Sequence, residues 1–329
     1  MIRELFERSV IFGAGGGGDV VSAYVVCELL KSVYGVSSCL PGAVLWERWV
    51  VDPYPGPIPR HLIRNAVVEN CVYVGSNTYA ERSGRVVRLT SAAVAEVAGV
   101  EVPSVTLEYG VVGIRKCFDE LAGEGWRIVL LDVGGDILAR GTEGGLWSPL
   151  ADSLSLAAAS EIDAPLVVLA PGADGELDVD YVVSRVAEVQ VLGGLYGVIG
   201  LWVDLVRTYE SILPKVTSEA SRVPYIALKG QIGEVKMRGG SRRTYIGPLS
   251  LVGFVLSSKV AAAISPLAKA LAGTRSLAEA RKAVNLIGVA TELDMEIELA
   301  KIVGCGRPAS GDDYIKAREI ARRKLASPS

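Results

Sequence analysis

The chain has 329 residues, half of them hydrophobic, and a formal net charge of −3. This length is enough to bury a large core, as one large domain or two. The high hydrophobic content predicts a globular protein. The near-neutral charge supplies no basic field for nucleic acid or an anionic membrane, so we expect a small-molecule partner, with no nucleic-acid and no membrane partner.

Short apolar runs alternate with helical patterns in the first half of the chain. The candidate strands are Ser9–Phe12, Cys39–Trp46, Cys71–Gly75, Ser104–Glu108, Ile128–Asp132 and Leu166–Ala170, with a hairpin inserted at Arg82–Leu89. The candidate helices are Val20–Tyr34, Ser91–Ala98, Val111–Ala122, Pro149–Ser160 and Val179–Val189. Near-continuous apolar strands indicate a parallel sheet that is covered on both faces. The predicted fold is therefore α/β: a doubly wound, mostly parallel, Rossmann-like sheet with helices on both faces.

The second half of the chain changes character. Gly193–Pro214 is predicted to be a long apolar helix. Short antiparallel strands are expected at Tyr225–Lys229, Glu234–Met237 and Arg243–Ile246, the last two forming a late hairpin. From about Val255 the pattern is mostly helical and ends in a helix at Asp312–Lys324. We expect a Rossmann-like α/β domain over residues 1–254 and a C-terminal helical region, residues 255–329, packed as a cap on the same domain.

The most informative segment runs from Val10 to Asp19, where an apolar strand leads into a glycine-rich loop and then a helix. Gly13, Gly15 and Gly18 satisfy the G-x-G-x-x-G pattern of dinucleotide-binding loops, and the start of a helix suits an anion. The glycines expected to bind a phosphate-bearing cofactor or substrate are Gly15, Gly16, Gly17 and Gly18. Asp19 would repel that phosphate unless a cation lies between them; alternatively, it is only the N-cap of the helix.

Acidic residues and glycines also follow other candidate strands, at the sheet edge where α/β folds bind ligands. Those singled out are Glu47, Asp132, Gly134, Gly135, Asp136, Glu143 and Asp152. Gathered carboxylates persist when they hold a divalent metal, bind a cationic group or share protons. Oxygen ligands favour Mg²⁺ or Mn²⁺, and the expected metal ligands are Asp19, Asp132 and Asp136. The candidate catalytic groups are Asp136, Glu143 and Asp152, and the candidate cofactor contacts besides the loop are Glu47, Gly134 and Gly135.

Several residues also have structural interpretations. Ser148 followed by a proline is typical of a helix N-cap and first turn, which would make Asp152 a first-turn acid. The acidic residues of the loop 174–178 are expected to be solvated or to cap a helix. Arg242 and Arg243 are expected on a solvated face, unless the hairpin folds over the crevice and they clamp a phosphate or carboxylate.

The five cysteines are scattered without C-x-x-C spacing, and His61 is the one histidine. We interpret the cysteine pattern as that of a reducing cytosol rather than a zinc cluster, with Cys27 and Cys117 in the core. A single histidine excludes His-rich zinc sites, and His61 is expected to be structural. The expected location is cytoplasmic, because no uncharged stretch reaches the roughly 20 residues of a membrane span and the charged N-terminus does not predict a signal peptide.

The chain lacks the G-x-x-x-x-G-K-[ST] and G-x-S-x-G motifs, which argues against a P-loop nucleotidase and a hydrolase triad. An NAD dehydrogenase is not favoured, because Glu47 lies later than the acid that binds the ribose. Taken together, Phe12–Asp19, Asp132–Asp136 and Ser148–Asp152 resemble an uncharacterised archaeal family, domain of unknown function 1152, over most of residues 8–300. The resemblance implies an archaeal source and a Rossmann-like fold, and it carries no established activity.

The leading hypothesis is a cytosolic enzyme that binds a nucleotide or small phosphorylated metabolite at the glycine-rich loop, with Mg²⁺ or Mn²⁺ held by aspartates. One alternative keeps the pocket without metal, as a lyase or hydrolase acting on an amine or polyol. Another is a non-catalytic nucleotide-sensing module. The high apolar content also makes a homodimer plausible.

Overall fold

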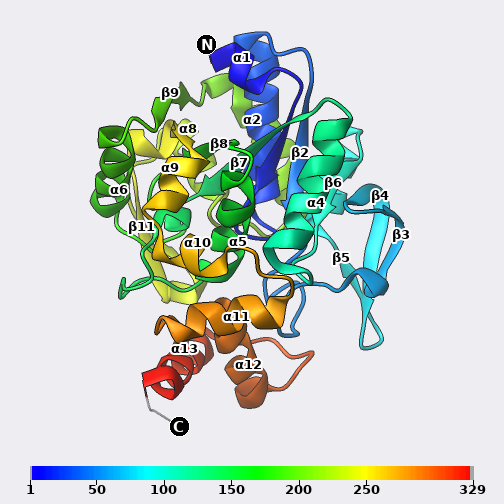
Figure 1. Cartoon of the computed structure of the whole chain (residues 1–329), viewed down its shortest axis with the longest axis vertical. Coiled ribbons are helices and arrows are strands. Elements are labelled where there is room, and N and C mark those ends of the chain that lie inside the picture. Colours follow the sequence, from blue (N-terminus) through cyan, green and yellow to red (C-terminus); the bar gives the residue numbers. More distant parts are fainter. Residues whose placement is uncertain (1, 327–329) are drawn as a thin grey trace.

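Five parallel strands form the centre of the sheet in the computed structural model, which describes residues 2–326 (Figure 1). In sheet order they are β6 (Val102–Val105), β2 (Cys39–Val44), β1 (Ser9–Gly13), β7 (Arg127–Val133) and β8 (Pro165–Leu169). The winding direction reverses between β1 and β7, because the chain builds β2 and β6 on one side of β1 before it returns to add β7 on the other. The carboxyl ends of β1 and β7 therefore flank the crevice where α/β folds bind ligands.

Helices cover both faces of this sheet, which confirms the doubly wound arrangement. One face carries α1 (Ile2–Phe6), α2 (Asp19–Tyr34), α7 (Val206–Ile212) and α8 (Arg222–Leu228), with α3 (Thr90–Ala98) beside α2. The other face carries α4 (Gly110–Gly123), α5 (Pro149–Ser160) and α6 (Val179–Val191). Successive β1 side chains alternate between the two cores: Val10 and Phe12 pack with α4 and α5, and Ile11 packs with α2.

Antiparallel strands extend the sheet on both sides. Beyond β6 lie β4 (Val72–Arg82), β3 (Ile63–Val68) and β5 (Arg85–Arg88), and beyond β8 lie β12 (Val252–Ser257) and β9 (Leu195–Gly200). The turn between β4 and β5 confirms the inserted hairpin. A separate two-stranded sheet of β10 (Gly233–Met237) and β11 (Arg242–Ile246) confirms the late hairpin. The sequence interpretation missed β3, β9 and β12.

Two of the elements predicted in the second half of the chain are wrong predictions. The helix expected at Gly193–Pro214 is instead β9 followed by α7, because β9 pairs with β12 and buries Ile199. The strand expected at Tyr225–Lys229 belongs to α8, where Tyr225 packs against Tyr209 of α7 with ring centroids 5.9 Å apart. In both cases a short apolar run fits a buried strand and a buried helix equally well, and long-range packing decides between them.

The last part of the chain is helical, as expected. It consists of α9 (Ser258–Ala263), α10 (Pro266–Leu271), α11 (Leu277–Leu286), α12 (Glu292–Val303) and α13 (Gly311–Ala326). α9 and α10 pack on α5, while α11, α12 and α13 lie together at the end of the molecule remote from α1 (Figure 1). The boundary expected between residues 254 and 255 falls inside β12. Met1 and residues 327–329, at the outer ends of the two expected regions, lie outside the described residues.

Two disulfides contradict the interpretation of the cysteines. Cys27 pairs with Cys39 and joins α2 to β2, and Cys71 pairs with Cys117 and joins the start of β4 to α4. Cys27 and Cys117 are buried, as expected, and Cys305 is the free cysteine among the described residues. Scattered spacing did not reveal these pairs, because the partners meet only when the sheet forms. The cysteine pattern therefore no longer supports a reducing cytosol, and the cytoplasmic location stays a prediction.

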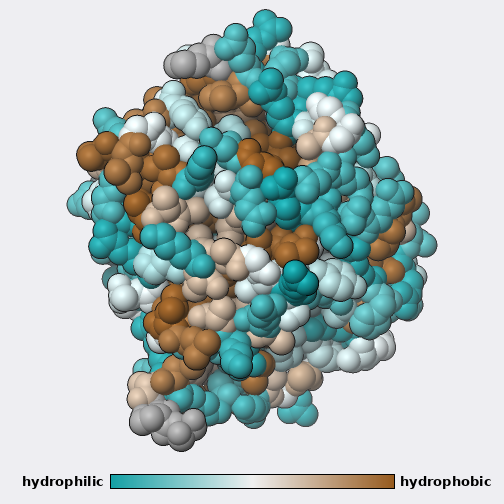
Figure 2. Space-filling model, in the orientation of Figure 1, coloured by the Kyte–Doolittle hydropathy of each residue, from teal (hydrophilic) through white to brown (hydrophobic). Residues whose placement is uncertain are grey.

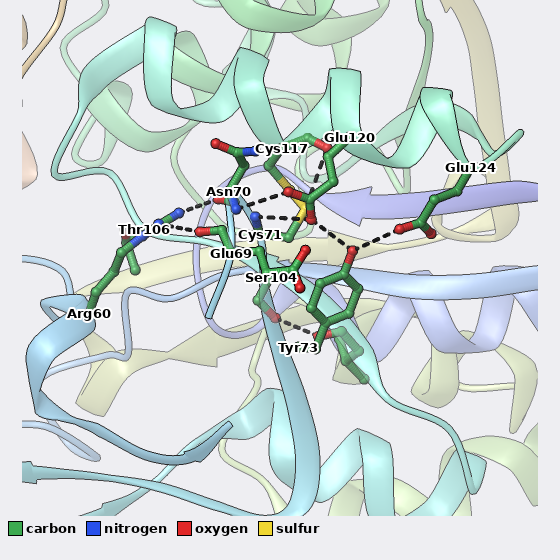
Figure 3. Close-up of a disulfide and its surroundings, with 11 residues drawn as sticks. Arg60, Glu69, Asn70, Cys71, Tyr73, Ser104, Thr106, Cys117, Glu120 and Glu124 are labelled. Carbon is green, nitrogen blue, oxygen red and sulfur yellow. Dashed lines mark hydrogen bonds between the residues drawn. A yellow bond between two sulfur atoms is a disulfide. The ribbon is translucent and has the colours of Figure 1, made fainter. Parts of the chain in front are cut away.

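Hydrogen bonds surround the disulfide between α4 and the turn that precedes β4 (Figure 3). The carboxylate of Glu120 on α4 accepts hydrogen bonds from the amide of Asn70 at 2.9 Å and from the hydroxyl of Tyr73 at 2.8 Å. The helix is thus attached to this turn by both a covalent bond and a polar network.

Hydrophobic side chains gather on the surface over α6 and β9 (Figure 2). The exposed residues of this region include Val191 and Leu192, which are 85% and 56% exposed, and Val198 on β9. β9 is the last strand on its side of the sheet. Across the described residues, no helix combines the length and apolar character needed to cross a bilayer. The homodimer stays a prediction.

Candidate functional site

Three aspartates from separate elements converge at the carboxyl ends of β1 and β7. Asp19 is the first residue of α2, Asp132 lies near the end of β7, and Asp152 lies in the first turn of α5. One carboxylate oxygen of each lies within 4.8 Å of the others. The three residues, called the acid triad below, are 7%, 1% and 2% exposed.

Among the described residues, the acid triad forms no ion pair. Asp132 Oδ2 and Asp152 Oδ1 accept no hydrogen bond, and no lysine or arginine in the described part of the chain pairs with the three residues. Burial raises the pKa of Asp19 to about 7 and the pKa values of Asp132 and Asp152 well above the usual range, and the neighbouring carboxylates raise the latter two further. Unpartnered carboxylate oxygens in this arrangement are ligands that suit a hard divalent cation.

A second acid cluster, Asp136, Asp174 and Glu176, lies next to the acid triad, with one oxygen of each within 4.8 Å of the others. Burial raises the pKa of Asp174 to about 7, and the charge of Glu176 adds to this effect. Burial also opposes ionisation of Glu176, but Arg242 and hydrogen bonds from Ser148 outweigh it, so the pKa of Glu176 is lowered. Glu176 thus already has its cation, whereas the acid triad does not.

The sequence predicts solvated surfaces for the acidic loop 174–178 and for the β10–β11 hairpin, but parts of both are buried. Arg242 Nη1 lies 2.6 Å from Glu176 Oε1, and both side chains are 1% exposed. The guanidinium of Arg242 also lies 4.6 Å from the ring centroid of Trp147. β11 folds over the loop and buries this pair, while Arg243, the next residue, is exposed and pairs with Glu234 at 2.8 Å. Neither arginine lines the cavity described below.

Of the two N-cap interpretations, that of Asp19 is wrong, and that of Ser148 is confirmed in position only. The N-cap of α2 is Gly18, and Asp19 instead accepts a hydrogen bond from the Gly15 amide at 3.0 Å. Ser148 does occupy the N-cap position of α5, but its side chain makes no capping bond. Glu292 of α12 caps the helix instead, because its carboxylate accepts the amides of Leu150 and Ala151 at 2.8 Å each. A side chain distant in sequence has replaced the local cap.

A cavity of about 410 Å³ lies over the glycine-rich loop, within the size range of ligand pockets. Asp19 lines it, while Asp132 and Asp152 are more buried and lie outside its described lining. Its other lining residues include Gly15, Gly16, Gly17, Trp46, Glu47, Arg48, Trp49, Val50, Ser148, Glu219, Arg238, Glu292, Met295, Glu296 and Tyr314. The helices α12 and α13 therefore form one wall of the cavity, and the loop after β1 forms another.

The glycines of the loop make room for carboxylates. A Cβ on Gly15 would lie 2.8 Å from both carboxylate oxygens of Asp152, and a Cβ on Gly17 would lie 2.6 Å from Glu47 Oε2. Any larger residue at either position would displace a buried acid. Glycine is therefore needed at these two positions because carboxylates of the protein itself occupy the adjacent space.

Much of the hydrogen-bonding capacity of the loop is already used. The Gly17 amide donates to Trp46 O at 2.8 Å and the Asp19 amide to Gly16 O at 3.1 Å, in addition to the bond from Gly15 to Asp19. Among the described residues, the amides of Gly16 and Gly18 have no acceptor. A phosphate at this loop would thus depend on side chains or a cation more than on the backbone.

The remaining predicted residues fall into two groups. Glu47 lines the cavity, and its carboxylate accepts the amide and hydroxyl of Thr90 at 2.7 Å each. Gly134 and Gly135 have positive φ values of 127° and 102° and pack against the side chains of Asp174 and Val182. They lie outside the described lining of the cavity, as do Asp136, Glu143 and His61.

Glu143 lies apart from both acid clusters. Its carboxylate accepts the amides of Arg140 and Gly141 at 2.7 and 2.8 Å and the Tyr181 hydroxyl at 2.5 Å. These bonds close the turn that follows residue 139. Their effect on ionisation outweighs burial, so the pKa of Glu143 is lowered. The catalytic group predicted at this position therefore lies in a loop outside the described lining of the cavity.

Sequence reasoning missed the contribution of α12. Glu292 and Glu296 are four residues apart, which places them on one face of the helix. Glu296 Oε2 accepts Trp46 Nε1 at 3.1 Å and the Gly56 amide at 2.8 Å. Burial raises the pKa of Glu292 to about 7 and that of Glu296 to about 8. The signal that could have identified them is a pair of acids on a helix face that otherwise packs against the core.

Comparisons with known proteins place the chain in a family. No curated protein and no solved structure matches it. The archaeal source implied by the resemblance stays a prediction. The model of a family described as a protein of unknown function, DUF1152, matches residues 10–300, which include most of β1, the glycine-rich loop, the acid triad and most of α12. The chain therefore belongs to the DUF1152 family.

Proposed function

We propose that this protein is a divalent-cation-dependent enzyme that acts on a nucleotide or a small phosphorylated metabolite. The cation, Mg²⁺ or Mn²⁺, would be held by Asp19, Asp132 and Asp152, and the phosphorylated substrate would occupy the adjacent cavity. This ligand set replaces Asp136 of the sequence-based proposal with Asp152. Asp136 would then support Asp132, with which it shares a hydrogen bond.

The observation that carries the proposal is the pair of buried, unpartnered oxygens, Asp132 Oδ2 and Asp152 Oδ1. Leaving a buried carboxylate oxygen without a partner is unfavourable. A divalent cation would satisfy both atoms and offset the repulsion among three acids. Because Asp19 also lines the cavity, a substrate there would be close enough to share the cation.

The cavity supports an anionic substrate. Its lining includes two guanidinium groups, those of Arg48 and Arg238. A divalent cation bound by acidic residues can bridge them to a phosphate, polarise a phosphoryl oxygen and lower the pKa of a bound water. These properties suit hydrolysis or transfer of a phosphorylated group.

A thermal-shift experiment tests the proposal. The purified protein is melted with ADP, AMP or ribose 5-phosphate, each with and without Mn²⁺. The proposal predicts that phosphate ligand and Mn²⁺ together raise the melting temperature more than the sum of their separate effects. A ligand at 100 times its Kd adds ~2.7 kcal/mol, which is readily measured.

The matched variants are Asp132→Asn and Asp119→Asn, the second an exposed residue of α4 that pairs with Arg115. Asp132→Asn should abolish the joint effect and Asp119→Asn should preserve it. An amine that stabilises the protein without metal would instead support the metal-free lyase or hydrolase. Tight nucleotide binding without turnover would support the sensing module.

A further inference from the structure

Two arginines line the cavity, and they differ in whether another side chain pairs with them. Arg238 Nε lies 3.9 Å from Glu219 Oε2, so its charge has a partner. Arg48 is half-buried, and within residues 2–326 its guanidinium makes no hydrogen bond or ion pair. A half-buried guanidinium that lines a cavity and has five unused N–H donors is suited to an anion.

Arg48 lies beside the glycine-rich loop, close to the start of α2. Its Nε would lie 3.8 Å from a Cβ on Gly18, so the side chain lies against the glycine-rich loop. Gly18 directly precedes Asp19, which lines the same cavity. An anion bound to Arg48 would therefore lie next to Asp19, the member of the acid triad that lines the cavity.

Part of the cavity wall is apolar and aromatic, formed by Trp49, Met295 and Tyr314 among the acidic lining residues. Trp49 and Met295 are 2% and 5% exposed, and Tyr314 is partly exposed on α13. The indole N–H of Trp49 is occupied by Arg307 O at 2.9 Å, so that ring offers the cavity no polar group. A bare phosphate or a sugar phosphate would leave this wall unused, whereas a planar base would pack against it.

We infer that Arg48 binds the phosphate of a nucleotide whose base lies against Trp49, Met295 and Tyr314. This inference rests on the proposed function and narrows its substrate class from phosphorylated metabolites to nucleotides. Arg48 acts as a specificity-determining residue: it holds a phosphate oxygen while the acid triad holds the cation.

Isothermal titration of the full-length protein tests the inference with three probes: ADP in the presence of Mn²⁺, adenosine, and Mn²⁺ alone. Arg48→Gln should weaken ADP binding 10- to 100-fold and leave adenosine and Mn²⁺ binding within twofold of wild type. Arg48→Lys keeps the charge and loses the planar fork, so its affinity for ADP should fall between those of wild type and Arg48→Gln. Arg243→Gln, an exposed arginine paired with Glu234, is the matched control and should bind all three probes like wild type.

The outcomes separate this inference from the proposed function. If Mn²⁺ does not bind the wild-type protein, the proposed function fails. If Mn²⁺ binds but ADP binds wild type and Arg48→Gln equally, or does not bind at all, only the inference about Arg48 and nucleotides is overturned. Equal loss of adenosine and ADP in Arg48→Gln also overturns it, because the arginine would then be supporting the cavity wall instead of a phosphate.

Discussion

Gly15 is predicted to contact a phosphate, but in the structure carboxylates of the protein itself lie against it. Its position in a G-x-G-x-x-G pattern predicts a phosphate contact, yet the space beside its Cα is filled by the carboxylates of Asp152 and Asp19. The pattern coincides with a loop whose backbone other groups approach closely. The sequence could not show which group makes that approach, since Asp152 is distant along the chain.

Gly15→Ala should therefore weaken both folding and metal binding. The added Cβ would lie 2.8 Å from two Asp152 oxygens and 3.0 Å from Asp19 Oδ2, so the acid triad must move. We expect a loss of ~1–3 kcal/mol in the free energy of unfolding, as for other overpacked sites, measured by urea denaturation. Gly144→Ala is the control, because a Cβ there meets no atom within 4 Å. Equal stability of the two variants would show that the triad is not packed against Gly15.

Glu296 makes a pH-dependent contribution to stability. Burial raises its pKa to about 8 in the folded state, well above about 4.3 for an unfolded chain. The folded state therefore holds the proton where the unfolded state has lost it, so stability falls as the pH rises from about 4.3 to 8.

Glu296→Gln should remove this loss, because glutamine stays neutral and keeps an acceptor for Trp46 and Gly56. Allowing for relaxation around a buried group, we expect the variant to be ~2 kcal/mol more stable than wild type at pH 8 and nearly equal at pH 4. Thermal and urea unfolding at the two pH values measure this. A difference that does not change with pH would contradict the raised pKa.

At the scale of elements, the start of α5 connects the parts of the site. It carries Asp152, and its free amides are capped by Glu292 of α12, while Glu176 accepts the amide of Ser148 at 3.0 Å. The helix itself was predicted with its observed bounds, 149–160. Its caps could not be predicted, because both acids come from segments that reach α5 only in the folded chain.

The disulfide between Cys71 and Cys117 should contribute substantially to stability. It closes a loop with a sequence separation of 46, for which chain entropy predicts about 4 kcal/mol. The double variant Cys71→Ser/Cys117→Ser should lose a large part of that amount in urea denaturation without reductant. In wild type, thiol titration under denaturing conditions should detect Cys305 alone before reduction and all five cysteines afterwards. Five thiols before reduction would contradict both disulfides.

At the scale of the whole molecule, the C-terminal helices complete the cavity. The alternation of strands and helices predicted the parallel centre of the sheet and the edge of the sheet at which the cavity lies. It did not predict that α12 and α13 form a wall of the cavity, since nothing in an amphipathic helix specifies which surface it covers. The antiparallel strands β9 and β12 were missed for the same reason: their pairing depends on the completed sheet.

Ligand binding should therefore protect segments that are far apart in the sequence. With Mn²⁺ and ADP, hydrogen exchange should slow at the loop after β1 and in α12 and α13, because all three line the cavity. α6, which lies outside the cavity lining, is the internal control and should exchange at an unchanged rate. Protection limited to the glycine-rich loop would show that the C-terminal helices do not contact the ligand.

The most direct test of the central claim is calorimetric titration of Mn²⁺ alone into wild type and Asp132→Asn, with Asp119→Asn as the control. The acid triad predicts saturable binding to wild type and to the control, with about one ion per chain held at the triad. It also predicts that this ion is lost in Asp132→Asn while the variant still unfolds cooperatively. Absence of saturable binding in wild type, or the same affinity in a folded Asp132→Asn, would contradict the assignment of these three aspartates as a metal site.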